Sequence, residues 1–170
     1  RNIMTSPFVA ILMGSDSDLP VMQATIDILK QFDITHEVRV RSAHRTPDAA
    51  KAYVKDAEER GCKVFICAAG LAAHLAGAVA GMTTRPVIGV PVDCGPLQGH
   101  DALLSTVMMP GGIPVATVAI GKAGAKNAGY LAAQILGVAD QSMADKVKAE
   151  RIANAKALLA KDDAMQAKLS

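Results

Sequence analysis

Two short polar segments in the first third of the chain carry side chains that could bind an anion and transfer a proton. The first, residues 13–18, reads MGSDSD and directly follows an apolar run. A helix that starts after such a segment presents backbone N–H groups that suit a phosphate, and the hydroxyls of Ser15 and Ser17 add donors. Asp18 would repel phosphate but can accept hydrogen bonds from sugar hydroxyls. The segment lacks GxGxxG and the P-loop lysine, and taken alone it is equally typical of a turn rich in capping residues.

The second segment, residues 42–47, reads SAHRTP and places an imidazole beside a guanidinium. Arg45 offers a planar fork of N–H donors that matches a phosphate. His44 can exchange a proton near neutral pH. A lone histidine is more often structural than catalytic, but this one follows an expected strand and stands beside a second polar segment. We therefore interpret His44 as the proton carrier of an active site.

Later segments are less specific. Residues 68–75 read AAGLAAHL, and their small side chains would let a flat ligand approach the backbone closely. His74 in this segment either lines a pocket or is a hydrogen-bonded core histidine, and we favour the pocket. His100 is interpreted as a surface residue, and nothing beside Cys94 argues for a nucleophile. The start of a helix at residues 122–127, KAGAKN, suits either a ligand or the packing of another subunit.

These segments need elements that hold them together, and the apolar pattern predicts five strands that alternate with helices. Strands are expected at residues 8–13, 36–40, 64–67, 87–90 and 115–120. Helices are expected at residues 19–29, 46–61, 72–82, 101–107 and 123–136.

This alternation predicts an α/β fold with right-handed crossovers and a parallel sheet covered on both faces. The expected architecture is a flavodoxin-like three-layer αβα sandwich with a five-stranded sheet in the order 2-1-3-4-5. Ligands of such sheets bind beyond the C-terminal strand ends, near the first strand. The polar segments follow strands one and two, so the fold would bring them to one site.

The length of 170 residues suits one domain, residues 1–170, with an α/β core at residues 8–140. Residues 141–170 are expected to form a helical extension, with an extra helix at residues 141–160. Apolar residues of that helix need a surface to pack on, namely Met143, Val147, Ile152, Ala155 and Leu159. We expect a neighbouring subunit to supply it.

Composition limits the function classes. The chain has 18 basic and 16 acidic residues, a net charge of +2 that leaves no electrostatic footprint for nucleic acid. Its three cysteines form no CxxC pair, so neither a disulfide framework nor a metal site is expected, and free thiols favour the cytoplasm. Residues 64–82 carry no formal charge and are as long as a short membrane span. Their composition changes from strand to turn to small-residue helix, so we expect no membrane segment.

The segments together resemble a known family, the class I N5-carboxyaminoimidazole ribonucleotide mutases of purine biosynthesis. The resemblance runs from about residue 9 to residue 140 and rests on residues 13–18, 42–47, 72–75, 109–118 and 119–127. It implies a flavodoxin-like subunit in a homo-octamer, with no metal and no organic cofactor. It also implies a small-molecule substrate, an aminoimidazole ribonucleotide.

The resemblance also assigns roles to residues. His44 would be the general acid and base, and Asp18 would hold the ribose hydroxyls. The phosphate would be held by Ser15, Ser17, Ser42 and Arg45. The base and the carboxylate would be flanked by Gly70, Ala73, His74 and Leu75. The implied reaction is decarboxylation, trapping of CO2 in a small apolar pocket and recarboxylation at C4.

Three positions depart from the pattern that is common in the family. Leu71 stands where a second glycine is common, Ala76 stands where proline is common, and Met108 stands where glutamine is common. These departures concern the shape of the pocket and the rigidity of its loops. None of them removes the proton carrier or a phosphate ligand.

Two alternatives stay open. The related class II carboxylase uses free CO2, but it tends to carry lysine in place of Arg45 and lacks the Ala-Ala-His of residues 72–74. A non-catalytic flavodoxin-like binding module is the second. A response regulator would need a phosphorylatable aspartate where residues 68–70 read AAG, and an FMN carrier would usually use aromatic residues, yet the chain has no tryptophan.

Overall fold

The computed structural model describes residues 7–169. Residues 1–6 and 170, which belong to the single domain expected for residues 1–170, lie outside the described residues. The elements in chain order are β1 (Phe8–Met13), the short 3-10 helix η1 (Asp16–Asp18), α1 (Leu19–Gln31), β2 (His36–Val40), α2 (Pro47–Glu59), β3 (Cys62–Ala69), α3 (Leu75–Ala80), β4 (Val87–Pro91), α4 (His100–Val107), β5 (Ala116–Thr117), α5 (Gly121–Gly137) and α6 (Gln141–Leu169).

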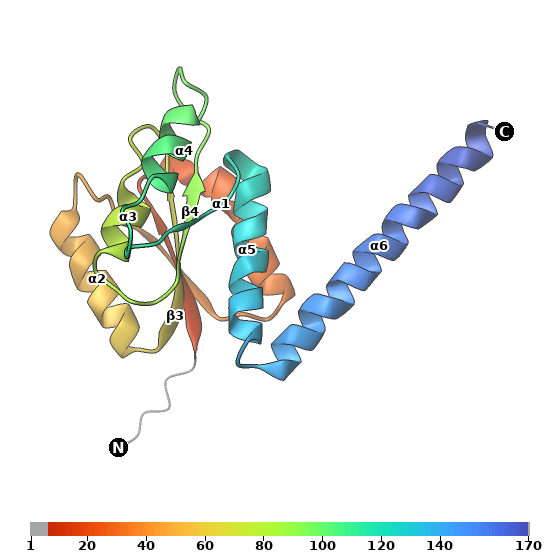
Figure 1. Cartoon of the computed structure of the whole chain (residues 1–170), viewed down its shortest axis with the longest axis horizontal. Coiled ribbons are helices and arrows are strands. Elements are labelled where there is room, and N and C mark those ends of the chain that lie inside the picture. Colours follow the sequence, from red (N-terminus) through yellow and green to blue (C-terminus); the bar gives the residue numbers. More distant parts are fainter. Residues whose placement is uncertain (1–6, 170) are drawn as a thin grey trace.

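The sheet has the predicted order, β2-β1-β3-β4-β5, and every neighbouring pair is parallel. The flavodoxin-like α/β fold is therefore confirmed (Figure 1). The register aligns the ends of three strands, because Met13 at the end of β1 is opposite Val40 of β2 and Ala68 of β3. The segments that follow these strands consequently start at one edge of the sheet.

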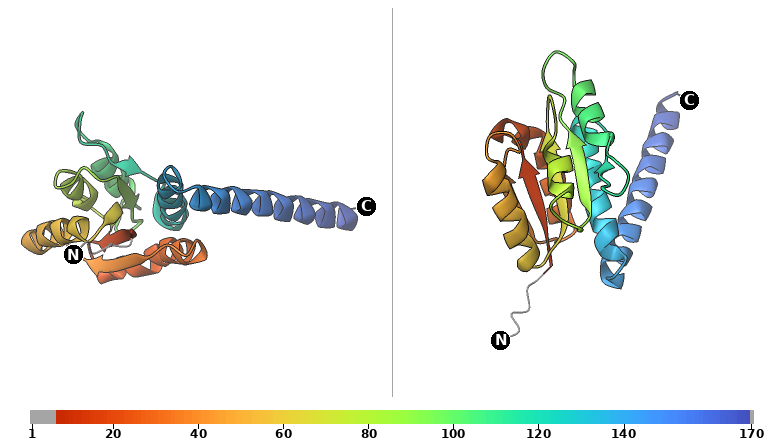
Figure 2. Two further views of the ribbon diagram at one scale, coloured as in Figure 1. Left: turned by 90° about the horizontal axis from the view of Figure 1, so that it is seen from below. Right: turned by 60° about the vertical axis from the view of Figure 1, so that its left-hand side comes forward.

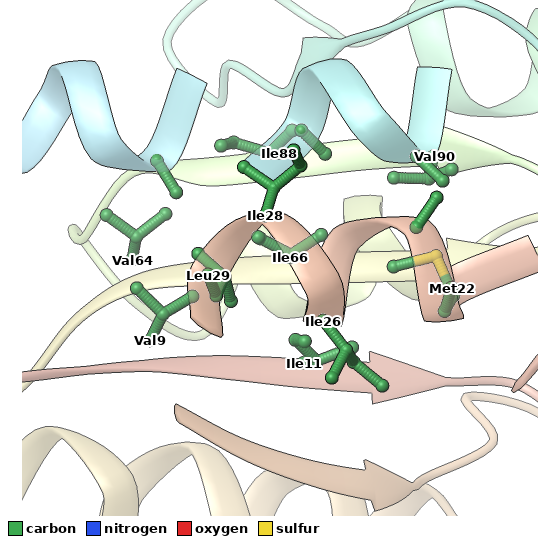
Figure 3. Close-up of a cluster of buried hydrophobic side chains, with 14 of the residues drawn as sticks. Val9, Ile11, Met22, Ile26, Ile28, Leu29, Val64, Ile66, Ile88 and Val90 are labelled. Carbon is green, nitrogen blue, oxygen red and sulfur yellow. The ribbon is translucent and has the colours of Figure 1, made fainter. Parts of the chain in front are cut away.

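Helices pack on both faces of the sheet. Alternate residues of the central strands point to opposite sides, so Ile11 and Ile66 join the cluster under α1 and α5, shown in Figure 3. Leu12 and Phe65 join the second cluster, which includes residues of α2 and α3. With an aromatic fraction of only 3%, the core relies on aliphatic side chains and close packing. This rigid sandwich holds the loops at the carboxyl edge of the sheet.

Some expected boundaries were wrong. β5 is only Ala116–Thr117 instead of residues 115–120, because this edge strand pairs with β4 alone before the chain turns into α5. α3 is only Leu75–Ala80 instead of residues 72–82, because Leu71 adopts a left-handed backbone (φ 56°) and residues 71–74 stay outside the helix. Among residues 7–169, no helix combines the length and the hydropathy of a membrane span.

Helix α6 extends to Leu169, beyond the expected end at residue 160, and projects away from the sandwich (Figures 1 and 2). Its first turns pack on the core through Val147, which is buried, and Met143, which is partly buried. From residue 151 to residue 169 every side chain is exposed. Ile152 and Leu159 are 62% and 66% exposed, so the described part of the chain supplies no surface for the distal half of the helix.

Candidate active site

The loop after β1 is organised by its own polar side chains. The Ser15 hydroxyl caps η1, where its oxygen accepts hydrogen bonds from the Ser17 N–H at 3.3 Å and the Ser17 hydroxyl at 2.8 Å. The Asp18 carboxylate accepts the Ser15 N–H at 3.0 Å, which completes a capping box. Asp18 is only 5% exposed, and this burial raises the pKa of its carboxyl group above the ordinary value. The backbone N–H groups of Ser15 and Gly14 and the charge of Arg45 oppose that increase in pKa without cancelling it.

The loop after β2 is tied to the first loop by Arg45. The Arg45 guanidinium donates a hydrogen bond to the Gly14 carbonyl oxygen at 2.7 Å, and the Arg45 backbone N–H donates to the Ser42 hydroxyl oxygen at 3.1 Å. Ser42 itself is buried, and its N–H donates to the Thr46 hydroxyl oxygen at 2.9 Å. The two polar segments therefore form one connected structure in which Arg45 spans both loops.

Two histidines from different loops meet at this edge of the sheet. Nε2 of His44 lies 2.8 Å from Nδ1 of His74, and the two rings are nearly perpendicular, with an interplanar angle of 86°. A hydrogen bond between two imidazole nitrogens requires that one carries a hydrogen and the other does not. Of the four ring nitrogens of His44 and His74, at least one must therefore lack a hydrogen while this bond exists. The two rings together can then carry a single positive charge, as the transfer of one proton requires.

A cavity of about 540 Å³ joins the three loops. Its lining residues are Gly14, Ser15, Ser17, Asp18, Ser42, Ala43, His44, Arg45, Ala69, Gly70, Leu71, Ala72, His74, Leu75 and Cys94. Hydroxyl and guanidinium groups come from the first two loops, and small or aliphatic side chains come from the third. The arrangement can hold an anionic, polar group at one end and a small apolar species at the other, with His44 and His74 in the same pocket.

The family model described as AIR carboxylase matches residues 8–157. The chain belongs to the AIR carboxylase family. Proteins named N5-carboxyaminoimidazole ribonucleotide mutase are similar to it: the one from Thermotoga maritima is 58% identical, over 84% of this chain and 82% of that protein. Those from Bacillus subtilis and Mycobacterium tuberculosis H37Rv are 55% and 52% identical, over 85% and 94% of this chain and 90% and 91% of theirs. The crystal structure of Treponema denticola PurE superimposes with a TM-score of 0.83 at 34% identity, covering 92% of this chain and 97% of that one.

The AIR carboxylase match includes every residue that lines the cavity. Of the residues expected to bind substrate, the structure brings all but Ala73 into the lining. Ala73 is buried behind the cavity wall, and Ala72 lines the cavity in its place. Adjacent residues of a loop point to different sides, and the sequence alone did not show which of the two alanines faces inward.

Several lining residues were missed by sequence reasoning, and Cys94 is the most informative. It lies just after β4, at the same sheet edge, and its sulfur would be 2.0 Å from a Cβ atom built on Gly70. Gly70 is therefore required by the thiol that packs against it. The rule that ligands bind beyond the carboxyl ends of parallel strands could have identified Cys94, because it applies to β4 as well.

Other polar residues lie away from this cavity. His100 is exposed, and its Nδ1 lies 3.0 Å from the Leu97 carbonyl oxygen, in keeping with the expected surface position. Lys126 and Asn127 border a different cavity, of about 550 Å³, together with Tyr130 and Arg151. In the part of the chain that the structure describes, no group of three or more His, Cys, Asp or Glu side chains is placed to hold a metal ion.

Asp18→Asn should raise the free energy of unfolding near pH 7. The amide keeps an oxygen that can accept the Ser15 N–H but carries no charge to desolvate. Because the folded-state pKa of Asp18 is raised, the wild type loses stability relative to the variant as the pH rises through that pKa. Below the ordinary aspartate pKa the two proteins should be equally stable. Urea unfolding followed by circular dichroism between pH 3 and pH 8 measures the difference.

The control is Asp27→Asn, which changes an exposed aspartate on α1. It should change the free energy of unfolding by less than about 0.5 kcal/mol. An Asp18→Asn protein that is less stable than the wild type at pH 7 would mean that the N–H groups and Arg45 outweigh the cost of burial.

Proposed function

We propose that this chain is an N5-carboxyaminoimidazole ribonucleotide mutase, which moves a carboxyl group from nitrogen N5 to carbon C4 of its substrate. The observation that carries the proposal is a single cavity that combines hydroxyl and guanidinium donors, a histidine pair and a small apolar wall. The curated relatives at 52–58% identity bear the name of this activity.

The phosphate of the ribonucleotide binds at the polar end of the cavity. Arg45 supplies a guanidinium that is already held by the Gly14 carbonyl, so little side-chain entropy is lost when it binds an anion. Hydroxyl donors come from Ser15, Ser17 and Ser42, and Asp18 accepts from the ribose hydroxyls. The buried Asp18 already accepts one backbone N–H, which fixes its carboxylate before the sugar arrives.

His44 carries the proton. When CO2 leaves N5, that nitrogen gains an electron pair and takes a proton from the His44 imidazolium, which becomes neutral. Carbon C4 then attacks CO2, and the neutral imidazole removes the C4 proton, so His44 returns to its starting state. His74 supports this cycle by a hydrogen bond to His44 Nε2 that orients the ring.

The apolar end of the cavity retains CO2 between the two steps. Leu71, Ala72 and Leu75 line it together with Ala43 and Ala69, and none of these side chains can hydrogen-bond the gas. A neutral molecule of this kind is held by enclosure more than by affinity. A wall of small aliphatic side chains therefore serves the reaction better than polar groups would.

The decisive experiment offers the purified protein two substrates. N5-carboxyaminoimidazole ribonucleotide should be converted rapidly without added CO2, whereas aminoimidazole ribonucleotide with bicarbonate and CO2 should be carboxylated slowly. The second substrate is included because the family description names a carboxylase. Rapid turnover only with free CO2 would assign the class II reaction instead, and turnover of neither substrate would favour a binding module.

His44→Asn should keep the fold and substrate binding but lower kcat by several orders of magnitude, because the amide cannot exchange a proton near neutral pH. Steady-state kinetics and ligand titration measure the two effects separately. His100→Asn is the matched control, since His100 is exposed and lies outside the cavity, and its kcat should stay within about twofold of the wild type. A His44→Asn enzyme with nearly wild-type turnover would remove His44 from its role.

We further propose that the protein forms a homo-octamer in which α6 packs on a neighbouring subunit. The proposal is supported by the exposed apolar side chains of the distal helix, where Ile152, Ala155 and Leu159 have helical spacing and share one side. A projecting helix with such a stripe requires another surface to cover it. Because Cys62, Cys67 and Cys94 are free, we also place the enzyme in the cytoplasm.

Light scattering coupled to size exclusion should give eight times the 17.6 kDa of one chain. A double variant, Ile152→Glu with Leu159→Glu, should form smaller species, because each helix would bring two unpaired charges into the contact with its neighbour. Lys161→Glu, on the opposite side of the helix, should keep the wild-type mass. A monomeric wild-type protein would contradict the proposal.

A further inference from the structure

Two adjacent side chains of α4 hold the peptide that precedes His74. The Ser105 hydroxyl oxygen accepts the Ala73 N–H at 2.9 Å, and the Thr106 hydroxyl donates to the Ala73 carbonyl oxygen at 3.3 Å. Ala73 is buried, so neither of its backbone groups can exchange these bonds for water at little cost. Both polar groups of one residue are thus bound by a helix that is 32 to 33 residues away in the sequence.

The two hydroxyls are themselves fixed by α4 and by the sheet. Ser105 donates its own hydrogen to the Asp101 carbonyl oxygen one turn earlier, at 2.6 Å, which leaves its lone pairs free to accept the Ala73 N–H. Thr106 is 2% exposed, and its methyl carbon would lie only 2.4 Å from a Cβ atom at Gly89. Glycine at position 89 of β4 therefore provides the space in which Thr106 sits.

The position of Ala73 determines the position of His74. The next residue, His74, is the N-cap of α3, and its Nδ1 lies 2.8 Å from Nε2 of His44. A displacement of the Ala73 peptide would be transmitted through one Cα atom to the imidazole, and a hydrogen bond weakens steeply when its length and angle change. Ser105 and Thr106 are not among the residues that line the cavity, so they act on it only through this loop.

We propose that Ser105 and Thr106 are positioning residues that hold the His74 imidazole within hydrogen-bonding distance of His44. The kinetic part of this inference rests on the mutase activity proposed above, whereas its structural part does not. The two loops that bind the phosphate end, those after β1 and β2, are held by hydrogen bonds among their own residues and not by α4. Loss of the Ser105 and Thr106 hydrogen bonds should therefore affect turnover more than substrate affinity.

Ser105→Ala should lower kcat by about 10- to 100-fold, the usual consequence of a displacement near 1 Å at a reacting group, and should change KM by less than about threefold. Thr106→Val keeps the shape of the side chain but loses the hydroxyl that donates to the Ala73 carbonyl oxygen, so it should also lower kcat. Ser105→Thr keeps the hydroxyl and should restore most of the turnover.

The matched control is Thr83→Ala. The Thr83 hydroxyl oxygen accepts a hydrogen bond from the Arg85 backbone N–H at 3.0 Å. Thr83 precedes β4, so it lies at the opposite end of that strand from the cavity. This variant loses a bond of the same type and should keep the wild-type kcat. Equal losses of kcat in Thr83→Ala and Ser105→Ala would reduce the effect to general destabilisation and overturn the inference.

A double-mutant cycle tests whether Ser105 acts through His74. In a His74→Ala background, Ser105→Ala should cause no further loss of kcat, because the side chain that it positions is gone. An unchanged 10-fold or greater loss in that background would overturn the inference, as would a Ser105→Ala kcat within twofold of the wild type.

Crystal structures of the ligand-free variants separate this inference from the proposed function. The Nε2 to Nδ1 distance between His44 and His74 should exceed 3.5 Å in Ser105→Ala and stay near 2.8 Å in Thr83→Ala. If the wild type converts neither substrate, the proposed function fails while these distances still decide the positioning role. An unchanged distance in Ser105→Ala would overturn that role whatever the activity.

Discussion

The parallel register of three strands is the constraint on which the site depends. Because Met13, Val40 and Ala68 stand side by side, the chain leaves β1, β2 and β3 at one level. The loops that follow cannot separate without breaking the hydrogen bonds between these strands, of which β1 and β3 are largely buried between two layers of helices. The loops are therefore close enough for direct hydrogen bonds between their side chains. The Arg45 guanidinium reaches the Gly14 carbonyl oxygen, and the His44 imidazole reaches that of His74.

The division of the cavity into a polar and an apolar end also follows from this arrangement. The first two loops begin helices, and their serines and aspartate are residues that favour helix starts for local hydrogen bonding. The third loop follows the central strand β3, where small side chains are needed for close approach to Cys94. Residues that local structure favours are thus the residues to which we assign the binding of the ribonucleotide and of CO2. The histidine pair is built from the second and third loops.

Much of this was predictable from the sequence, because apolar periodicity and strand ends are local signals. The strand order, and with it the meeting of the polar loops at one edge of the sheet, depends on those signals and on the crossover rule. Nine of the ten site residues named in advance line the cavity, and the roles given to them came from the family resemblance. What could not be predicted depends on contacts between distant segments. Ala73 was expected in the cavity, but its backbone is turned toward Ser105 and Thr106 of α4, and no local pattern reveals such a bond. The direct contact of His44 with His74 was missed for the same reason.

Leu71 shows how a departure from the usual family residue can be accommodated. Its φ of 56° is one that glycine adopts without steric cost, whereas a left-handed backbone costs a residue with a side chain roughly 1–2 kcal/mol. The cost is offset in part because the leucine side chain packs over Gly95, where a Cβ atom would lie 2.6 Å from Leu71 Cδ2. A glycine at position 71 would leave bare backbone at this wall of the cavity. The leucine instead extends the apolar wall toward the loop after β4, and in the proposed mechanism this wall encloses CO2.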